Sequence, residues 1–445
     1  MFARLFWVAA ALLAVLPCDA FADDWPQWMG AERDGIWREQ GIRQTLPEQP
    51  PIKWEAAVGG GYAGPAVADG RVFLMDYQKS SGTIANNPGG RTQLEGQERV
   101  LCFDAASGET LWTHAYDRPY AISYAVGPRT TPAVDSGRVY TLGAEGNLKC
   151  LGVEDGEVQW EVDLQKTYGV SAPIWGFAAH PLVDGDLVYT MVGGNGTGIV
   201  AWDKTTGEEK WRALAAKDAG YCPPQIIEVG GVRQLIAWTP QEVASLDPAT
   251  GEVFWSQPLA PNYGMSIAMP RLAGDRLLVT GYDKNAVFKL TVEGGRPAAE
   301  EVWNSPGRKS LYCSNSTPMI DEGLAYGCDI TSGELRAISL ADGSQVWATR
   351  DPVGYGSRPG KGRRHATAFL TQIVGQDRFI LWNDQGDLIF CTLDPKGYAE
   401  QSRMHVLDPT QEAFGQLVLW TPPAYAERTA FVRNDQKLVA VDLAE

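Results

Sequence analysis

The chain has 445 residues, of which 44% are apolar and 21% charged, and its formal net charge is −16. A surface of that charge repels nucleic acid and anionic lipid headgroups, so the composition argues against either as a partner. The 49 glycines are typical of an all-β protein with many turns. Length alone would predict two or three domains, but the repeats described below predict a single one.

The first 22 residues have the pattern of a secretory signal peptide. Arg4 supplies the positive charge, and residues 5–16 are apolar but too short to cross a bilayer comfortably. Ala20-Phe21-Ala22 fits a cleavage site that would leave Asp23 as the new N-terminus. We therefore expect an exported protein, periplasmic or secreted, without a transmembrane segment once the signal is removed.

A lipoprotein signal is the alternative interpretation of the same stretch. Cys18 would then be the acylated residue and would anchor the chain to a membrane. Pro17 argues against this alternative, because a small residue is expected directly before an acylated cysteine. Soluble export is the interpretation that we favour.

Residues 23–51 are rich in tryptophan and proline. Trp25, Trp28 and Trp37 lie close together, which does not suit a free tail. The prolines at positions 47, 50 and 51 keep the end of the segment extended. We expect an ordered strap over residues 23–51 that lies on a domain formed by residues 52–445.

The stretch 131–160 predicts three short strands and the start of a fourth. Apolar residues alternate with period two, and turns rich in Gly, Asp and Asn separate the runs, as in an antiparallel meander. Similar stretches recur along the chain and end in tryptophans about 44 to 51 residues apart, which is the length of a four-stranded propeller blade. These tryptophans are Trp112, Trp160, Trp211, Trp255, Trp303 and Trp347.

The residues at the end of each repeat are explained by the structure they form and imply no catalysis. In the first copy, Asp104 can accept backbone N–H groups and define a turn, and Gly108 supplies a positive φ. Trp112 can then pack between two blades and donate its N–H to a backbone carbonyl. The same spacing recurs at Asp203 and at Asp247.

The last repeat, within residues 421–443, lacks its fourth strand and its tryptophan. Residues 52–58, which contain Trp54, can supply both from the other end of the chain. Closing the ring in this way removes two sheet edges that could pair with other chains. The predicted fold is therefore an all-β, eight-bladed propeller of four-stranded antiparallel blades. The weakest repeat follows Trp347, because Met404 or His405 stands where its tryptophan is expected.

Six cysteines remain after the predicted cleavage, an even number that permits disulfides in an exported protein. Cys313 and Cys328 flank the first hairpin of one repeat and are the best candidate pair. Buried free thiols are at least as good an interpretation. The pairing therefore stays open at this point.

The Asp-x-x-Thr/Ser-Gly-x-x-x-Trp motif resembles the tryptophan-docking repeat of the pyrroloquinoline quinone (PQQ) β-propeller superfamily. The resemblance covers residues 52–443 and is specific for fold rather than function. The superfamily includes quinoprotein alcohol and glucose dehydrogenases and BamB, the non-enzymatic propeller of the outer-membrane β-barrel assembly machine. The opening Trp25-Pro26-Gln27-Trp28 and the tail around Tyr398 and Arg403 resemble a branch of exported bacterial PQQ-like propellers.

The dehydrogenase function implied by that resemblance requires PQQ with Ca²⁺, stacked on a pair of adjacent cysteines, and a catalytic aspartate. No two cysteines are adjacent here, and acidic residues at Tyr282-Asp283-Lys284-Asn285 and Asn383-Asp384 look like ordinary turns. Haem-attachment, serine-hydrolase, zinc-protease and P-loop motifs are missing from the sequence. The four histidines lack metal-ligand spacing.

The connections between predicted blades are rich in aromatic residues and should ring one face of the channel. Such a mouth suits a flat or anionic ligand or a peptide, although the same residues could simply pack the loops. The candidate binding residues are Tyr168, Trp175, His180, Tyr221, Tyr312, Arg364 and His365. We expect a non-catalytic exported propeller that binds or scaffolds a partner in the cell envelope. A PQQ-dependent oxidoreductase of alcohols or sugars is the alternative.

The first prediction concerns export. The mature protein should begin at or near Asp23, because Ala20-Phe21-Ala22 is the best-formed cleavage site in the sequence. Intact mass spectrometry of the protein, purified from the organism that encodes it, checks this directly. A mass that retains residues 1–22, or a mass that includes an acylated Cys18, would contradict the prediction.

Overall fold

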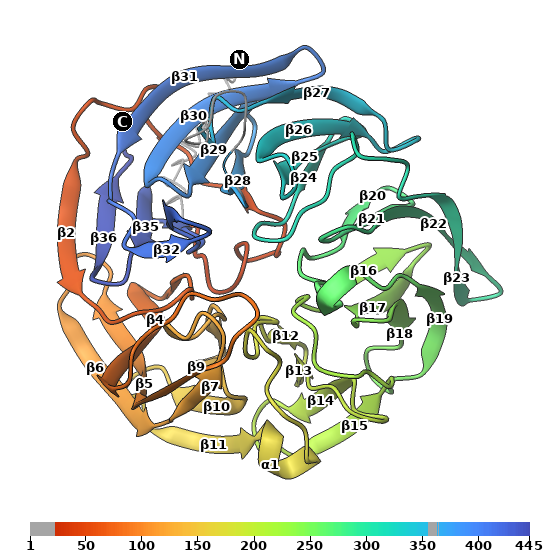
Figure 1. Cartoon of the computed structure of the whole chain (residues 1–445), viewed down its shortest axis with the longest axis horizontal. Helices are drawn as coiled ribbons and strands as arrows, with labels where there is room; N and C mark the ends of the chain where they lie inside the picture. Colours follow the sequence, from red (N-terminus) through yellow and green to blue (C-terminus); the bar gives the residue numbers. More distant parts are fainter. Residues whose placement is uncertain (1–22, 355–362, 364) are drawn as a thin grey trace, which may run out of the picture.

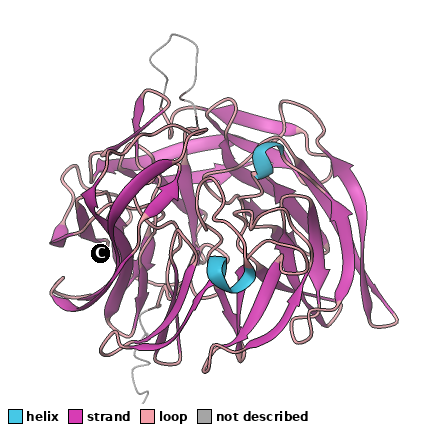
Figure 2. Ribbon diagram, turned by 60° about the horizontal axis from the view of Figure 1, so that its bottom comes forward, coloured by secondary structure: helices cyan, strands magenta, loops and turns pink. Residues whose placement is uncertain are grey.

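The computed structural model describes residues 23–354, 363 and 365–445. Within them the chain forms a ring of β-sheets around a central axis, with two short helices in the connections (Figure 1, Figure 2). The predicted signal peptide, residues 1–22, and the candidate binding residue Arg364 lie outside the described residues. No helix within the described ranges is long and apolar enough to span a bilayer.

Eight four-stranded antiparallel blades make up the ring, as predicted. From the channel outward, the first four consist of β3 (Ala66–Ala68), β4 (Arg71–Ser81), β5 (Thr92–Asp104) and β6 (Thr110–Asp117); β8 (Ala133–Asp135), β9 (Arg138–Leu142), β10 (Asn147–Gly152) and β11 (Val158–Asp163); β12 (Leu182–Asp184), β13 (Leu187–Met191), β14 (Ile199–Asp203) and β15 (Glu209–Ala213); and β16 (Gln225–Val229), β17 (Val232–Trp238), β18 (Glu242–Leu246) and β19 (Val253–Pro258).

The other four blades continue around the ring (Figure 1). They consist of β20 (Arg271–Ala273), β21 (Arg276–Thr280), β22 (Asn285–Glu293) and β23 (Arg296–Asn304); β24 (Met319–Asp321), β25 (Leu324–Asp329), β26 (Glu334–Ser339) and β27 (Gln345–Thr349); β28 (Ala368–Ile373), β29 (Arg378–Asn383), β30 (Asp387–Asp394) and β31 (Gly397–His405); and β34 (Ala424–Ala426), β35 (Thr429–Arg433), β36 (Lys437–Asp442) and β2 (Ile52–Ala57).

How clearly apolar and polar residues alternate along a strand depends on where the strand lies in its blade. Middle strands such as β9 and β10 are buried on both faces because blades pack against them from either side. Outer strands such as β6 alternate between half-buried and exposed residues, because one face meets solvent. The period of two therefore shows most clearly at the outside of the ring.

The predicted closing strand is confirmed. Strand β2 pairs antiparallel with β36, and Trp54 lies opposite Ala440 although the two are nearly 400 positions apart in sequence. The Trp54 ring packs 5.8 Å from the ring of Phe431 in the same blade. Its Nε1–H donates to the Ala105 carbonyl oxygen of the first blade at 2.8 Å, so one residue links the two ends of the chain.

The other repeat tryptophans make a similar link from each blade to the next. Five of them donate Nε1–H to a backbone carbonyl of the following blade: Trp112 to Val153, Trp160 to Lys204, Trp211 to Pro248, Trp303 to Leu340 and Trp347 to Asp394. Trp255 differs, because its Nε1–H donates to the Gln234 side chain within its own blade. In the repeat that lacks a tryptophan, the buried Met404 on β31 is part of the apolar core.

The glycine of the repeat has a second role that its turn alone does not reveal. A Cβ atom at Gly108 would lie 2.5 Å from the Trp54 ring, and a Cβ atom at Gly156 would lie 2.5 Å from the Trp112 ring. Both glycines also have positive φ angles. Glycine is therefore required twice, by the turn and by the indole that packs on it from the preceding blade.

The segment before the closing strand lies inside the channel and touches inner strands around the ring. We call residues 23–37 the plug. Trp25 pairs with Val67 on β3, and the two-residue strand β1 (Ile36–Trp37) pairs in parallel with β28. Between these points Arg33 donates to the carbonyl oxygens of Pro181 and Pro224. The plug therefore fills one end of the channel.

All six cysteines of the described residues are free and buried. The candidate pair Cys313 and Cys328 is thus not a disulfide, and the alternative of buried thiols holds. The Cys328 sulfur instead accepts the Ala368 N–H at 3.1 Å, which ties one blade to the next. Burial raises the pKa of both thiols, which keeps them protonated and unreactive.

The second prediction tests ring closure. Trp54→Ala should lower the free energy of unfolding by about 3–5 kcal/mol, because it removes a buried indole and the hydrogen bond to Ala105. Denaturant unfolding followed by circular dichroism measures the change. Leu111→Ala on the exposed outer strand β6 is the matched control and should stay within about 0.5 kcal/mol of wild type. A loss below 1 kcal/mol for Trp54→Ala would contradict the closure argument.

Candidate binding cup

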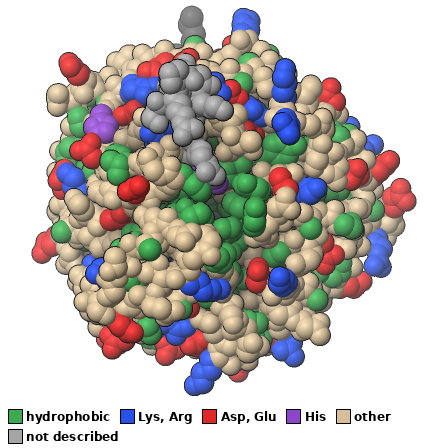
Figure 3. Space-filling view, in the orientation of Figure 1, with side chains coloured by type: hydrophobic (Ala, Val, Ile, Leu, Met, Phe, Trp, Pro, Cys, Tyr) green, Lys and Arg blue, Asp and Glu red, His purple; other side chains and the backbone are tan. Residues whose placement is uncertain are grey.

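A cavity of about 590 Å³ opens at the end of the channel opposite the plug. In Figure 3 it appears as a central hollow lined by hydrophobic side chains. We call this cavity the cup. It is lined by Tyr62, Pro88, Gly89, Tyr124, Arg129, Ile174, Trp175, Ala178, Tyr221, Tyr263, Met265, Ile267, Tyr282, Asn315, His365, Phe414 and Trp420. Its volume lies in the range of ligand-binding sites.

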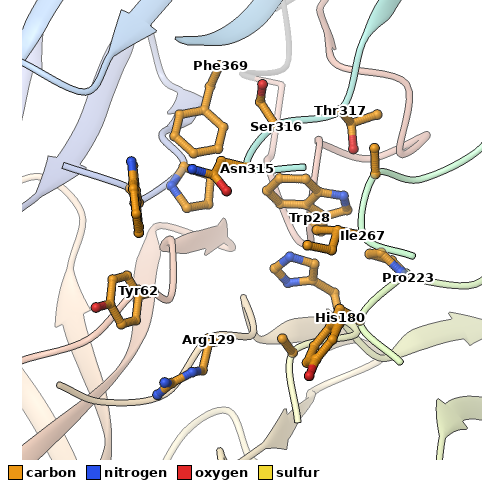
Figure 4. A pocket seen from close by; sticks show the side chains of 15 residues that line it. Trp28, Tyr62, Arg129, His180, Pro223, Ile267, Asn315, Ser316, Thr317 and Phe369 are labelled. Carbon is orange, nitrogen blue, oxygen red and sulfur yellow. The ribbon is translucent and has the colours of Figure 1, made fainter. Parts of the chain in front are cut away.

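A smaller space of about 150 Å³ continues from the cup toward the plug. We call it the inner chamber. It shares Tyr62, Arg129, Tyr221, Asn315 and Trp420 with the lining of the cup, so the two spaces adjoin. Trp28 of the plug and His180 line its deep end, where the two rings stack at 4.2 Å (Figure 4). The plug thus makes the channel blind at this end.

The structure brings together four of the predicted binding residues. Trp175, Tyr221 and His365 line the cup, and His180 and Tyr221 line the inner chamber. Trp175 packs 5.3 Å from Tyr221 and donates its Nε1–H to the Pro88 carbonyl oxygen. His365 stacks on Phe414 at 4.2 Å.

Two other predicted residues do not line the cup. Tyr168 ends helix α1 (Leu164–Tyr168), where its hydroxyl donates to Glu209 and its ring meets Trp202 edge-on. Tyr312 is buried behind the wall, and its hydroxyl donates to the Gly307 carbonyl oxygen. Both aromatic rings therefore hold connections onto the ring of blades, which is the alternative role that the sequence left open.

Sequence reasoning missed Trp28, Phe414 and Trp420. Phe414 and Trp420 come from the segment between β31 and β34, where the hairpin β32 (Gln411–Ala413) and β33 (Gln416–Val418) belongs to no blade. The sequence feature that could have indicated this hairpin was the extra length of the segment between the last two repeats. Pro88 and Gly89 come from the insertion in the first blade, which folds over the cup and places β7 (Tyr120–Ile122) against β5.

Arg129 organises one side of the cup through backbone carbonyl groups. Its guanidinium donates to the carbonyl oxygens of Ser123, Tyr124, Gly127 and Trp175 and lies over the Tyr62 ring. Burial lowers the pKa of Arg129 from its usual value. Because its donors are used on backbone carbonyls, Arg129 holds the loop that carries Trp175 instead of presenting an open cationic site.

One aromatic residue is held at the mouth in an exposed position. Tyr263, in the 3-10 turn η1 (Asn262–Gly264), is 77% exposed and has a φ of 60°. The turn is fixed by Asp283, whose carboxylate accepts both the backbone and side-chain N–H groups of Asn262. Tyr282 packs edge-on against the Tyr263 ring. An exposed aromatic ring on a fixed turn is typical of a partner-binding surface.

A buried carboxylate lies behind the wall that carries His365 and Phe414. Asp384 is fully buried; its Oδ2 is 3.3 Å from Arg363, and its Oδ1 has no hydrogen-bond partner. Burial raises the pKa of Asp384 to about 7, although Arg363 opposes this shift. Arg363 also donates to the Leu417 carbonyl oxygen in β33, so Asp384 and Arg363 join two segments of the cup wall.

The donor set of the cup does not fit a calcium-bound quinone. Ca²⁺ prefers carboxylate and carbonyl oxygens, yet no Asp or Glu is among the described residues that line the cup or the inner chamber. No group of three or more His, Cys, Asp or Glu in the described part of the chain could hold a metal ion. Asn383 and Asp384, two polar residues that the sequence offered for such a site, have other contacts. Asn383 fixes a turn, and Asp384 faces Arg363 in a buried pair.

The chain is similar to known proteins in sequence and in structure. The family model described as outer membrane protein assembly factor BamB matches residues 96–349. A protein of that name from Kangiella koreensis is 29% identical over 161 residues, which cover 35% of this chain and 36% of the relative. The one from Xanthomonas campestris pv. campestris is 27% identical over 236 residues, or 52% and 56% of the two chains. The matches thus span about a third to a half of these relatives.

Two solved structures share the fold over most of the chain. BamB from Moraxella catarrhalis superimposes with a TM-score of 0.54 at 15% identity, covering 87% of this chain and 98% of that one. Quinohemoprotein alcohol dehydrogenase from Comamonas testosteroni gives a TM-score of 0.59 at 13% identity, covering 94% and 80%. At such low identities these two similarities establish the propeller fold alone.

The third prediction concerns Asp384. Its pKa of about 7 in the folded chain exceeds the value near 3.9 of an unfolded aspartate. Between those values the folded state holds a proton that the unfolded state has lost, so this contribution to stability falls as the pH rises toward 7. Asp384→Asn mimics the protonated form, so its stability relative to wild type should increase by up to about 1.4 kcal/mol per pH unit over that range.

Thermal unfolding of both proteins at pH 5, 6, 7 and 8 measures this difference. Asp275→Asn, which makes the same atomic change on an exposed turn, is the matched control. A stability difference between Asp384→Asn and wild type that does not vary with pH would show that Asp384 is ionised throughout.

Proposed function

The chain belongs to the propeller family described as outer membrane protein assembly factor BamB, and we propose that it is an exported, non-catalytic propeller that binds a protein of the cell envelope through the cup. Family membership rests on the match over residues 96–349. The proposed partner is a protein segment that enters the cup. The proposal combines the family with the shape and chemistry of this site.

The single observation that carries the proposal is the aromatic cup itself. Tyrosine, tryptophan and phenylalanine rings from six connections between blades, and from the turn that carries Tyr282, converge on one cavity and supply most of its large side chains. Aromatic pockets at the centre of a contact surface are where most of the binding energy of protein partners is concentrated. The exposed ring of Tyr263 extends this surface beyond the mouth.

The loops that form the cup are positioned before a partner arrives. Arg129 ties the Trp175 loop to the preceding connection, and Trp175 ties it to the insertion at Pro88. Gln411 and Thr410 hold the β32–β33 hairpin to Asp435. A prearranged site loses little conformational entropy on binding, which favours affinity without any reactive group.

We also propose the division of the chain and its location. Residues 1–22 would be a cleaved signal, residues 23–51 an N-terminal strap, and residues 52–445 the propeller. The mature protein would then lie in the periplasm or be secreted, and a lipoprotein anchored at Cys18 is the alternative. The support is the charge and hydropathy pattern of the first 22 residues together with the family name.

The fourth prediction tests the cup as the partner surface. Trp175→Ala combined with Phe414→Ala should reduce capture of an envelope protein at least tenfold, because both anchoring rings are lost. The purified wild-type chain, carrying a photo-crosslinking amino acid at position 263, is exposed to envelope extract, and the adduct is identified by mass spectrometry. The double variant is then compared at equal concentration, with thermal unfolding as the folding check.

Leu111→Ala, an exposed apolar residue on the outer strand β6, serves as the matched control and should capture the partner as wild type does. Equal capture by the cup double variant would contradict the proposal. So would oxidation of alcohols or sugars, followed with an electron-accepting dye, that depends on added PQQ and Ca²⁺. That outcome would favour the oxidoreductase alternative instead.

A further inference from the structure

The inner chamber has polar groups that the apolar cup does not explain. It lies below the cup, and its walls include Phe369, Ile267 and Trp420 as well as His180 and Asn315. Figure 4 shows the Asn315 amide and the His180 ring bordering the same space beside the Trp28 indole. His180 and Asn315 therefore add polar atoms to a space whose other walls include large apolar rings.

His180 presents a hydrogen-bond donor to the chamber. The Thr131 N–H donates to its Nδ1 at 2.8 Å, so in the neutral ring the proton is on Nε2. Burial lowers the pKa of His180 well below 6.5, and nearby Arg33 acts in the same direction. His180 is 7% exposed, and among the described residues the hydrogen bond of its ring is the one that Nδ1 accepts from Thr131. A neutral donor is therefore buried at the chamber wall.

Asn315 presents the complementary acceptor. Its Nδ2 donates to the His365 carbonyl oxygen at 3.3 Å, which orients the amide and leaves Oδ1 without a described partner. Because the backbone of His365 belongs to the cup wall, the amide is held at the junction of the cup and the chamber. Beside the Ser316 and Thr317 hydroxyls, the chamber thus offers the His180 donor and the Asn315 acceptor.

These two groups favour a neutral occupant of the chamber over a charged one. An anionic group would face the amide oxygen of Asn315, and a cationic group would face the His180 N–H and the nearby Arg129 charge. A neutral hydroxyl is both an acceptor and a donor, so it matches the His180 donor and the Asn315 acceptor that line the chamber. The rings of Phe369, Trp420 and Tyr62 surround this position and suit an aromatic ring on the same occupant.

From this combination we propose that the inner chamber binds the phenol of a tyrosine side chain that the partner inserts through the cup. The inference rests on the proposed function and adds the identity of the anchoring residue. The phenol ring packs among Phe369, Trp420 and Tyr62, and its hydroxyl bonds to His180 and Asn315. Trp28 of the plug sets the depth at which the side chain stops.

The experiment compares two small probes on the full mature chain. N-acetyl-L-tyrosinamide should bind about tenfold more tightly than N-acetyl-L-phenylalaninamide, because the latter leaves the His180 donor and the Asn315 acceptor unpaired. Saturation-transfer NMR titrations give both dissociation constants. N-acetyl-O-methyl-L-tyrosinamide, which cannot donate, should bind no better than the phenylalanine probe.

Variants test whether the two side chains cause the preference. Asn315→Leu should bring the two probes to within about twofold of each other. His180→Phe should do the same while keeping a ring against Trp28, but it also removes the acceptor for the Thr131 N–H. Asn315→Leu therefore provides the decisive result if His180→Phe does not fold. Tyr168→Phe, which removes a hydroxyl outside the cup, is the matched control and should keep the tenfold preference.

The outcomes separate this inference from the proposed function. Equal binding of both probes to wild type, or no binding of either, overturns the tyrosine subsite, and so does a preference that survives Asn315→Leu. If the tyrosine subsite fails but capture of the envelope partner still depends on Trp175 and Phe414, the proposed function remains supported. Loss of the tyrosine preference only in the His180 and Asn315 variants supports the inference.

Discussion

The pairing of β2 with β36 is the constraint on which the rest of the structure depends. Without it, β36 and β2 would each present a row of unpaired backbone groups at an open edge. The pairing also places Trp54 where it can donate to the Ala105 carbonyl oxygen. The ring is therefore closed by backbone hydrogen bonds between strands and by one side-chain hydrogen bond. Only a closed ring places eight sets of connections around one axis, and those connections form the cup.

Closure also determines where the N-terminal segment can go. The chain reaches β2 only after crossing the channel. On the way Trp25 and β1 pair with inner strands of two blades, and Arg33 bonds to the residues just before the inner strands of two others. Arg271 from β20 donates to the carbonyl oxygens of Arg33 and Asp34, which holds the crossing in place. The same segment that closes the ring therefore blocks the channel, and Trp28 becomes the deep wall of the inner chamber.

The contrast between the cup and the outer surface is the main electrostatic feature of the molecule. The chain carries 54 acidic residues against 38 basic ones, yet the described lining of the cup holds none of the acidic residues. Nearby carboxylates such as Glu98 are buried behind the wall, where Tyr120 and the Ala144 N–H donate to them. The cup is thus a largely apolar surface within an acidic protein.

Much of the fold could be predicted from local patterns. Period-two alternation and turn residues place strands within each repeat, and the spacing of Trp112, Trp160 and Trp211 gives the length of a blade. The missing fourth strand of the last repeat predicted the closure by Trp54, because an unpaired edge is costly. The docking motif also indicated the family, since identical spacing recurs in successive repeats.

The cup could be predicted only in part, because it is formed by residues that are brought together by ring closure. Trp175 and Tyr168 belong to the same connection, yet one faces the cup and the other packs on Trp202. The sequence alone determined the repeat, the blades and the closing strand, because each depends on neighbours within one blade or on one obligatory pairing. Only the tertiary structure decided that Trp28 meets His180 in the channel, because that contact depends on the path of the plug through a closed ring.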